Sequence, residues 1–285
     1  MTNATLGRDA SEFAYIDADT IRKQLQKQGA GTKLKDLDLG ADSVGSKSPL
    51  AEYRVVTIIE GDTKDGLQAF GLKNDATGDV VVAFKGSQEA RDFYDDVASI
   101  GWAQWDEARS QVNSFLQTNW KSGDEVTFAG HSLGGALAQY AIYETAGTYD
   151  KRVSDMNLHT QSAPGAEHAI RENNGGALDT GRLSGAEMLN LYIDRDLVSK
   201  TGGDHLGATS VVANPSLLPG GLYSDHKLGN YTDAAIAGAK TGTPGYYDNE
   251  AIQTANPGLY KPLATWVGKL ALGAALASSF KYMRE

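Results

Sequence analysis

The segment "VTFAGHSLGGALAQYAIYE", residues 126–144, constrains the fold more than any other part of the chain. An apolar, β-branched run leads into a serine between two glycines and then into an alanine-rich segment of helical periodicity. Glycine is required two residues before and two residues after such a serine, because side chains there would clash with the adjacent strand and helix. Gly130 and Gly134 satisfy this requirement. The pattern predicts that Ser132 lies on a sharp strand-to-helix turn, where it can act as a nucleophile.

Strand-like and helix-like segments alternate along the rest of the chain. Apolar runs predict strands at 53–61, 66–74, 79–86, 124–130, within 153–165 and within 187–199. Helical patterns cover 9–29, 101–120 and 133–147, and Gly147 is expected to close the last of them. This alternation favours an α/β fold with a mainly parallel central sheet and helices on both faces. We expect one domain over residues 1–285, with an N-terminal helical extension of about 1–50.

Composition and charge narrow the range of partners. The formal net charge is −10, which argues against nucleic acid as a partner and against docking to anionic membranes by charge. The chain has no cysteine, so thiolate nucleophiles, disulfides and cysteine-ligated metals are excluded. The N-terminal stretch "MTNATLGRDASEFAY" has neither a basic region nor an apolar region of the kind found in Sec signals. We therefore expect secretion without a cleaved Sec signal, or else a cytoplasmic protein.

The segment "LATWVGKLALGAALASSF", residues 263–280, is the most apolar in the chain. It is about long enough to span a bilayer, but Lys269 lies within it, and a charge at mid-membrane is costly. This composition favours an apolar C-terminal helix packed on the domain over a helix that contacts a membrane.

A serine nucleophile needs a base and a group that orients the base. Where the nucleophile lies on such a turn, the acid and then the histidine follow it along the chain. Three of the five histidines fit poorly, since His131 is inside the turn and should point elsewhere, His159 lies in a strand, and His168 precedes the best acids. His205 and His226 remain as candidate bases.

Two aspartates stand at the end of the strand in "NLYIDRDLVS". Asp194 and Asp196 both lie at the carboxyl end of that strand, where parallel sheets form their active sites. The ordinary alternative for each is a solvated turn aspartate. Only one of the two should be catalytic.

Several segments, in this order, resemble the class 3 lipases, a family of α/β-hydrolases. They are "VVVAFKGSQEARDFYDD", "FAGHSLGGALA", "LHTQSAPG", "YIDRDLVS", "DHLGATSVV" and "DHKLGNY", and they span roughly residues 54–231. The resemblance implies that Asp196, which begins a D-x-V element, is the catalytic acid. It also implies that His226, which a tyrosine follows, is the base, with His205 as the alternative. In such an enzyme the backbone N–H of Leu133 and Ser87 in "FKGSQ" would form the oxyanion hole.

The resemblance implies a serine hydrolase that cleaves a fatty-acyl ester of a lipid. The chain looks most like the bacterial phospholipase A1 members, which cleave the sn-1 ester of glycerophospholipids. The alternatives are a triacylglycerol lipase or carboxylesterase, and a non-catalytic lipid-binding protein on a hydrolase scaffold. This chemistry requires no metal or organic cofactor. The expected partners are an acyl-ester lipid, a membrane or lipid interface, and a secretion chaperone or other accessory protein.

Two segments are candidates for the walls around the site. Residues 88–105 lie where the family places its lid, and they include Trp102 and Trp105. Residues 214–223 lie between the expected acid and base, so they could form a second wall. The alternative is that these aromatic residues simply belong to the hydrophobic core.

Overall fold

The computed structural model describes residues 3–61, 67–86, 101–194, 196, 198–212 and 226–242. The chain divides into two units, Met1–Pro244 and Gly245–Glu285. The second unit lies wholly outside the described residues, and so does the helix predicted at 263–280. The single-domain assignment therefore stays a prediction.

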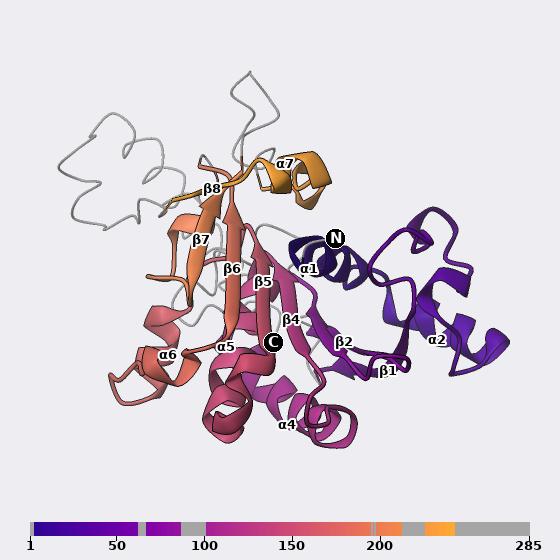
Figure 1. Cartoon of the computed structure of the whole chain (residues 1–285), viewed down its shortest axis with the longest axis horizontal. Coiled ribbons are helices and arrows are strands. Elements are labelled where there is room, and N and C mark those ends of the chain that lie inside the picture. Colours follow the sequence, from indigo (N-terminus) through magenta and orange to yellow (C-terminus); the bar gives the residue numbers. More distant parts are fainter. Residues whose placement is uncertain are drawn as a thin grey trace, which may run out of the picture. The chain divides into compact units, whose positions relative to one another are not determined.

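One eight-stranded sheet forms the centre of the first unit, and its strands lie side by side in the order of the chain (Figure 1). Strands β3 to β7 are parallel, while β1, β2 and β3 are joined antiparallel and β8 is antiparallel to β7. The fold class predicted from the sequence is confirmed. The strands are β1 (Tyr53–Glu60), β2 (Gln68–Asn74), β3 (Val80–Phe84), β4 (Val126–His131), β5 (Met156–Gln161), β6 (Glu187–Tyr192), β7 (Ala208–Val211) and β8 (Lys240–Thr241).

The strand order explains which helices cover which face. Crossovers between parallel strands are right-handed, so a sheet whose neighbours follow the chain order carries all its crossover helices on one face. Residues of α4 (Trp102–Asn119), α5 (Leu133–Thr148) and α6 (Glu167–Asn173) accordingly share one hydrophobic core, which Val82 and Phe128 of the sheet also join. The opposite face therefore needs a cover from elsewhere in the chain.

The N-terminal segment provides that cover. Helix α1 (Asn3–Phe13) packs on β3, β4 and β5, and with α2 (Ala18–Gln28) it forms the second hydrophobic core. Val81 and Ala83 point into this core, because successive side chains of β3 face opposite sides of the sheet. Leucines from the segment between α2 and β1 are also buried there, including Leu34 and Leu50. The extension is thus an integral layer of the fold.

The single helix predicted over 9–29 was wrong, because the chain breaks between α1 and α2. Asp17 has an extended backbone and caps α2 by accepting a hydrogen bond from the N–H of Thr20. The buried side chain of Gln68 donates to the carbonyl groups of Ala14 and Ile16 and accepts from the N–H of Ala18. A glutamine from β2 therefore satisfies the backbone groups that the break exposes, which no local pattern reveals.

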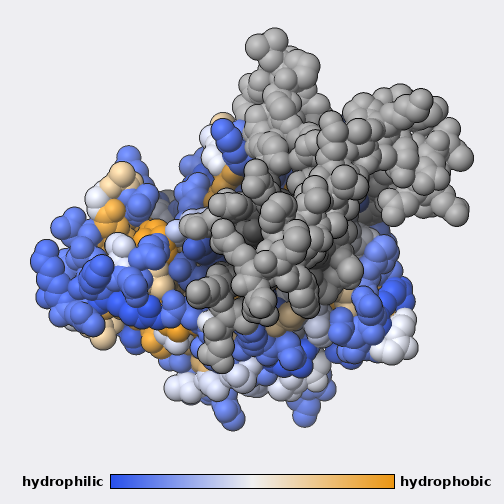
Figure 2. Space-filling model, turned by 180° about the vertical axis from the view of Figure 1, so that it is seen from behind, coloured by the Kyte–Doolittle hydropathy of each residue, from blue (hydrophilic) through white to orange (hydrophobic). Residues whose placement is uncertain are grey.

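Helix boundaries elsewhere are close to the predictions. Helix α5 runs through Gly147 to Thr148, so the glycine does not end it. Short 3-10 turns complete the first unit together with helix α7 (Asp233–Ala237). Within the described ranges, no helix has the length and hydropathy needed to cross a membrane. Viewed from behind, the described surface is mainly hydrophilic with small hydrophobic areas (Figure 2). The 3-10 turns are η1 (Leu34–Asp36), η2 (Gly40–Asp42), η3 (Asp150–Asp155), η4 (Thr180–Leu183), η5 (Val198–Lys200) and η6 (Leu228–Asn230).

Candidate active site

Ser132 lies on the sharp turn between β4 and α5 that the sequence predicts. Its backbone has φ 56° and ψ −132°, a conformation that costs a non-glycine residue free energy. A Cβ atom at Gly130 would lie 2.2 Å from the backbone of Gly134, and a Cβ atom at Gly134 would lie 2.3 Å from the carbonyl oxygen of Phe84. Both distances are far shorter than real contacts allow. The two glycines are therefore needed for the reason given from the sequence.

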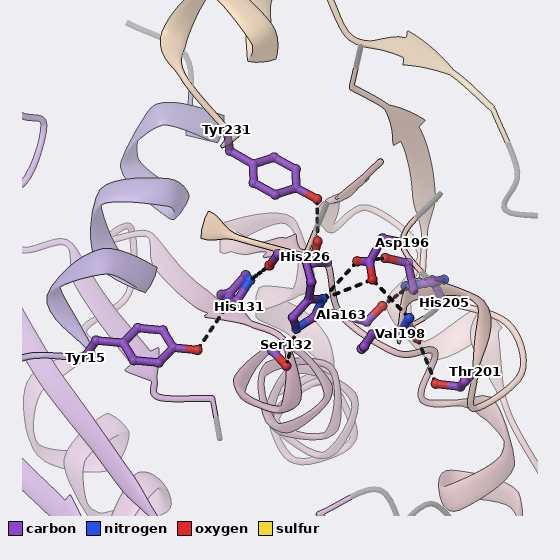
Figure 3. Close-up of polar contacts among 12 residues, drawn as sticks. Tyr15, His131, Ser132, Ala163, Asp196, Val198, Thr201, His205, His226 and Tyr231 are labelled. Atoms are coloured by element: carbon purple, nitrogen blue, oxygen red, sulfur yellow. Dashed lines mark hydrogen bonds and ion pairs between the residues drawn. The ribbon is translucent and has the colours of Figure 1, made fainter. Parts of the chain in front are cut away.

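The structure brings Ser132, His226 and Asp196 into one hydrogen-bonded row (Figure 3). Nε2 of His226 lies 2.8 Å from Oγ of Ser132, and Nδ1 lies 3.1 Å from each carboxylate oxygen of Asp196. A carboxylate only accepts, so Nδ1 carries the proton, and in the neutral ring Nε2 is free to accept from the serine hydroxyl. The imidazole is thus oriented to act as a base toward Ser132.

Asp196 is completely buried, and several donors stabilise its charge. The N–H of Val198 donates to one carboxylate oxygen at 3.0 Å, and the hydroxyl of Ser199 donates to the other at 2.7 Å. Burial alone would raise the pKa of Asp196, but its hydrogen bond with His226 and the charge of His226, helped by the hydroxyls of Ser162 and Ser199, lower it below its ordinary value. The residue is therefore a carboxylate at neutral pH.

The alternatives left open by the sequence lie elsewhere. Asp194 points outward, with three-quarters of its side chain exposed, and pairs with Lys200 at 3.5 Å. His205 is buried, and its Nε2 hydrogen-bonds the carbonyl group of Ala163 at 2.9 Å. Neither residue contacts Ser132 among the interactions of the described residues.

The side chain of His131 lies between Tyr15 and the backbone of His226, so it contributes to the site without being the base (Figure 3). Its Nε2 donates to the carbonyl oxygen of His226 at 2.7 Å, so its Nδ1 must accept, and the hydroxyl of Tyr15 lies 2.8 Å from that atom. Burial lowers the pKa of His131 to about 3, which keeps the ring neutral. A neutral ring matters here because the two imidazoles are 4.9 Å apart, and a charge on both would be repulsive.

One of the two predicted oxyanion donors can be described. Leu133 is the first residue of α5, and its N–H is among the first-turn groups that lack an intrahelical acceptor. The positive end of the helix dipole points at the same place. Ser87 lies outside the described residues and stays a prediction. Its neighbour Gly86 packs against the turn, since a Cβ there would lie 3.1 Å from Cβ of Ser132.

The two tryptophans at the start of α4, Trp102 and Trp105, pack against the hydrophobic core. Trp105 is 1% exposed and lies in the main hydrophobic core. Trp102 packs edge-on against Tyr140, and Arg109 lies over its ring. The rest of the predicted lid, residues 88–100, and the predicted second wall, 214–223, lie outside the described residues.

The sequence did not predict the residues that hold Asp196 and His226 in place. Tyr15 lies where a continuous helix was predicted, so its contact with His131 could not be seen. Val198 did carry a signal, because an aspartate commonly accepts from the backbone N–H two residues further on. Ser162 gave no local signal at all.

Comparison with known proteins supports the fold. Residues 58–151 match the model of a Tle-like phospholipase domain. No match to a curated protein sequence was found.

Similar solved structures include a mono- and diacylglycerol lipase from Aspergillus oryzae, with 18% identity, TM-score 0.57 and 86% of each chain covered. A mutant form of MDLA from Penicillium cyclopium has 18% identity and TM-score 0.51, over 79% of this chain and 84% of that one. A triacylglycerol lipase whose catalytic centre is formed by a serine protease triad has 16% identity and TM-score 0.51, over 75% and 80%. These likenesses establish the α/β-hydrolase fold.

Proposed function

We propose that this protein is a serine carboxylic ester hydrolase that releases a fatty acid from a lipid, and that its substrate is a phospholipid cleaved at the sn-1 ester. The observation that carries the reaction class is the continuous hydrogen-bonded row from Ser132 through His226 to the buried Asp196. The similarity of residues 58–151 to a Tle-like phospholipase domain supports a phospholipid over other acyl esters.

The first half of the proposed reaction uses the hydrogen-bonded row of Ser132, His226 and Asp196. Oγ of Ser132 attacks the ester carbonyl carbon while Nε2 of His226 takes the hydroxyl proton. Asp196 holds the ring in the required tautomer and stabilises the imidazolium that forms. The N–H of Leu133 and the α5 dipole stabilise the oxyanion, with Ser87 as the proposed second donor.

The second half regenerates the enzyme. The imidazolium gives its proton to the departing alcohol oxygen, which leaves as a lysophospholipid, and the acyl group stays on Ser132 as an ester. Water then loses a proton to His226 and attacks this ester. The fatty acid leaves, and Oγ takes its proton back.

A triacylglycerol lipase is the second candidate, favoured by the similarity of the fold to fungal acylglycerol lipases. In either case the acidic chain, with a net charge of −10, would be drawn to a lipid interface by apolar surface and not by charge. We further propose that the protein acts outside the cell that makes it and is exported without a cleaved Sec signal.

The test compares hydrolysis at the sn-1 and sn-2 positions of a phospholipid. Fatty acid release is measured from phosphatidylcholine labelled separately at sn-1 and at sn-2, and from triolein, with the wild type and Ser132→Ala. We expect sn-1 release by the wild type and none by Ser132→Ala, while an exposed control variant, Ser154→Ala, keeps full activity. Release from triolein alone would refute phospholipid as the substrate.

Full hydrolysis by Ser132→Ala would refute the mechanism. A fluorophosphonate probe adds a check that needs no lipid, because only an activated serine reacts with it. A folded wild type that the probe does not label would instead be a non-catalytic lipid-binding protein.

A further inference from the structure

Two residues other than glycine have positive φ within the described ranges, and both are serines at this site. One is Ser132. The other is Ser162, with φ 48°, which directly follows β5 and is completely buried. Such a conformation persists only where the surroundings hold it, and it is concentrated at functional positions. The strain at Ser162 therefore requires an explanation.

The side chain of Ser162 contacts the segment that carries His226. Its hydroxyl lies 2.7 Å from the phenol oxygen of Tyr231, which is also completely buried. Tyr231 lies five residues after His226, with the short turn η6 between them, so a bond to Tyr231 fixes the segment that carries the base. Figure 3 shows the hydroxyl of Tyr231 directed toward this part of the site.

The backbone of Ser162 is fixed independently of its side chain. Its N–H donates to the carbonyl oxygen of Leu191 at 2.9 Å, which continues the pairing of β5 with β6. Tyr231 is held by a small hydrophobic cluster with Leu191, Ile193 and Val212. The short bond between the two hydroxyls thus joins two rigid parts of the fold.

We propose that Ser162 is a positioning residue of the active site: its hydroxyl, bonded to Tyr231, anchors the segment that carries His226 to the end of β5. This inference rests on the proposed function, since it assigns a role in the same reaction. Ser162 touches neither substrate nor reacting atoms in this assignment.

The charges at the site set the direction of the hydrogen bonds. Burial and the nearby charge of Asp196 raise the pKa of Tyr231, so its phenol stays protonated and can donate to Oγ of Ser162. The Ser162 hydroxyl also helps to lower the pKa of Asp196, although less than the hydrogen bond and charge of His226 do. Removing the hydroxyl therefore breaks the bond to Tyr231 and leaves the segment that carries the base less firmly held.

The test separates the hydroxyl from the strain. Ser162→Gly and Ser162→Ala both remove the hydroxyl, but only glycine adopts positive φ without strain. We expect both variants to lose about fivefold in kcat with little change in KM, as for one lost neutral hydrogen bond. The melting temperatures should differ, with Ser162→Gly the more stable of the two.

The coupling between the two hydroxyls supplies the second readout. Tyr231→Phe should produce a similar loss, and combining it with Ser162→Gly should add little, because the two residues act through one bond. The exposed residue Ser154, changed to glycine, is the control.

The inference is overturned if Ser162→Gly matches the wild type in kcat, or if its loss simply adds to that of Tyr231→Phe. It is also overturned if activity merely follows the melting temperature, with Ser162→Gly close to the wild type and Ser162→Ala impaired. An active wild type with unaffected Ser162 variants refutes only this inference. A wild type that neither hydrolyses esters nor reacts with a fluorophosphonate refutes the proposed function and this inference with it.

Discussion

Replacing Asp196 with asparagine should remove nearly all activity while leaving the fold intact. The carboxylate accepts from Val198, Ser199 and His226, so an asparagine must turn its NH₂ group toward one of these donors. The N–H of Val198 cannot become an acceptor, whereas the Ser199 hydroxyl can rotate and accept. The NH₂ group is therefore expected on the Ser199 side.

That orientation places an N–H group against Nδ1 of His226, which is 3.1 Å from the same position. The ring then favours the tautomer with its proton on Nε2, and this tautomer cannot take the proton of Ser132. The negative charge that stabilises the imidazolium is lost as well. Triads altered in this way lose about 10⁴-fold in kcat, which corresponds to about 5 kcal/mol of barrier.

The assay is hydrolysis of a soluble chromogenic ester, with active protein counted by fluorophosphonate titration over long reaction times. The matched control is Asp194→Asn, since that side chain is exposed and pairs only weakly with Lys200. We expect the control to stay within twofold of the wild type. If Asp196→Asn stayed within tenfold of the wild type, or if Asp194→Asn lost more activity than Asp196→Asn, the tautomer argument would be wrong.

Two further predictions concern residues on the α1 face of the sheet. Burial lowers the pKa of His159 to about 4 from 6.5, and neither ring nitrogen has a hydrogen-bond partner among the described residues. The unfolded chain binds this proton more readily, so stability is lost as pH falls from 6.5 toward 4, by about 3 kcal/mol from this residue. The melting temperature of His159→Leu should therefore depend less on pH in that window, and an unchanged slope would contradict the assignment. Tyr15→Phe removes the donor to Nδ1 of His131, so the carbonyl group of His226 is held less firmly. We expect kcat to fall about fivefold, the usual effect of one neutral hydrogen bond, and a kcat equal to that of the wild type would show that Tyr15 plays no part in the site.

Local patterns predicted the turn and the sheet because both depend on neighbouring residues. The glycines around Ser132 are dictated by contacts within a few residues of the turn. Strand and helix periodicity reports burial, so β3, β4 and α5 begin close to their predicted positions. The order of the candidate acid and base along the chain narrowed the remaining choices, and Asp196 and His226 are the ones that the structure brings to Ser132.

Contacts between distant segments could not be predicted in this way. Gln68 satisfies the break between α1 and α2 across about fifty residues of sequence, and Tyr15 reaches His131 across more than a hundred. The strain at Ser162 is a backbone angle, and a serine in a strand-end sequence gives no sign of it. These features depend on which face of the sheet each segment covers, and that is settled only by the assembled fold.

The strand order of the sheet also bears on the order in which the strands can fold during synthesis. A chain that emerges from its N-terminus can add each new strand to the edge formed by the one before it, because neighbours in the sheet are neighbours in sequence. Ser132 takes its place with β4 and α5, but His226 follows 94 residues later. A nascent chain therefore passes through a stage in which the nucleophile is built and its base has not yet been made. On the proposed function, the cell that synthesises this protein would not face a working hydrolase until the segment ending at Tyr231 has docked.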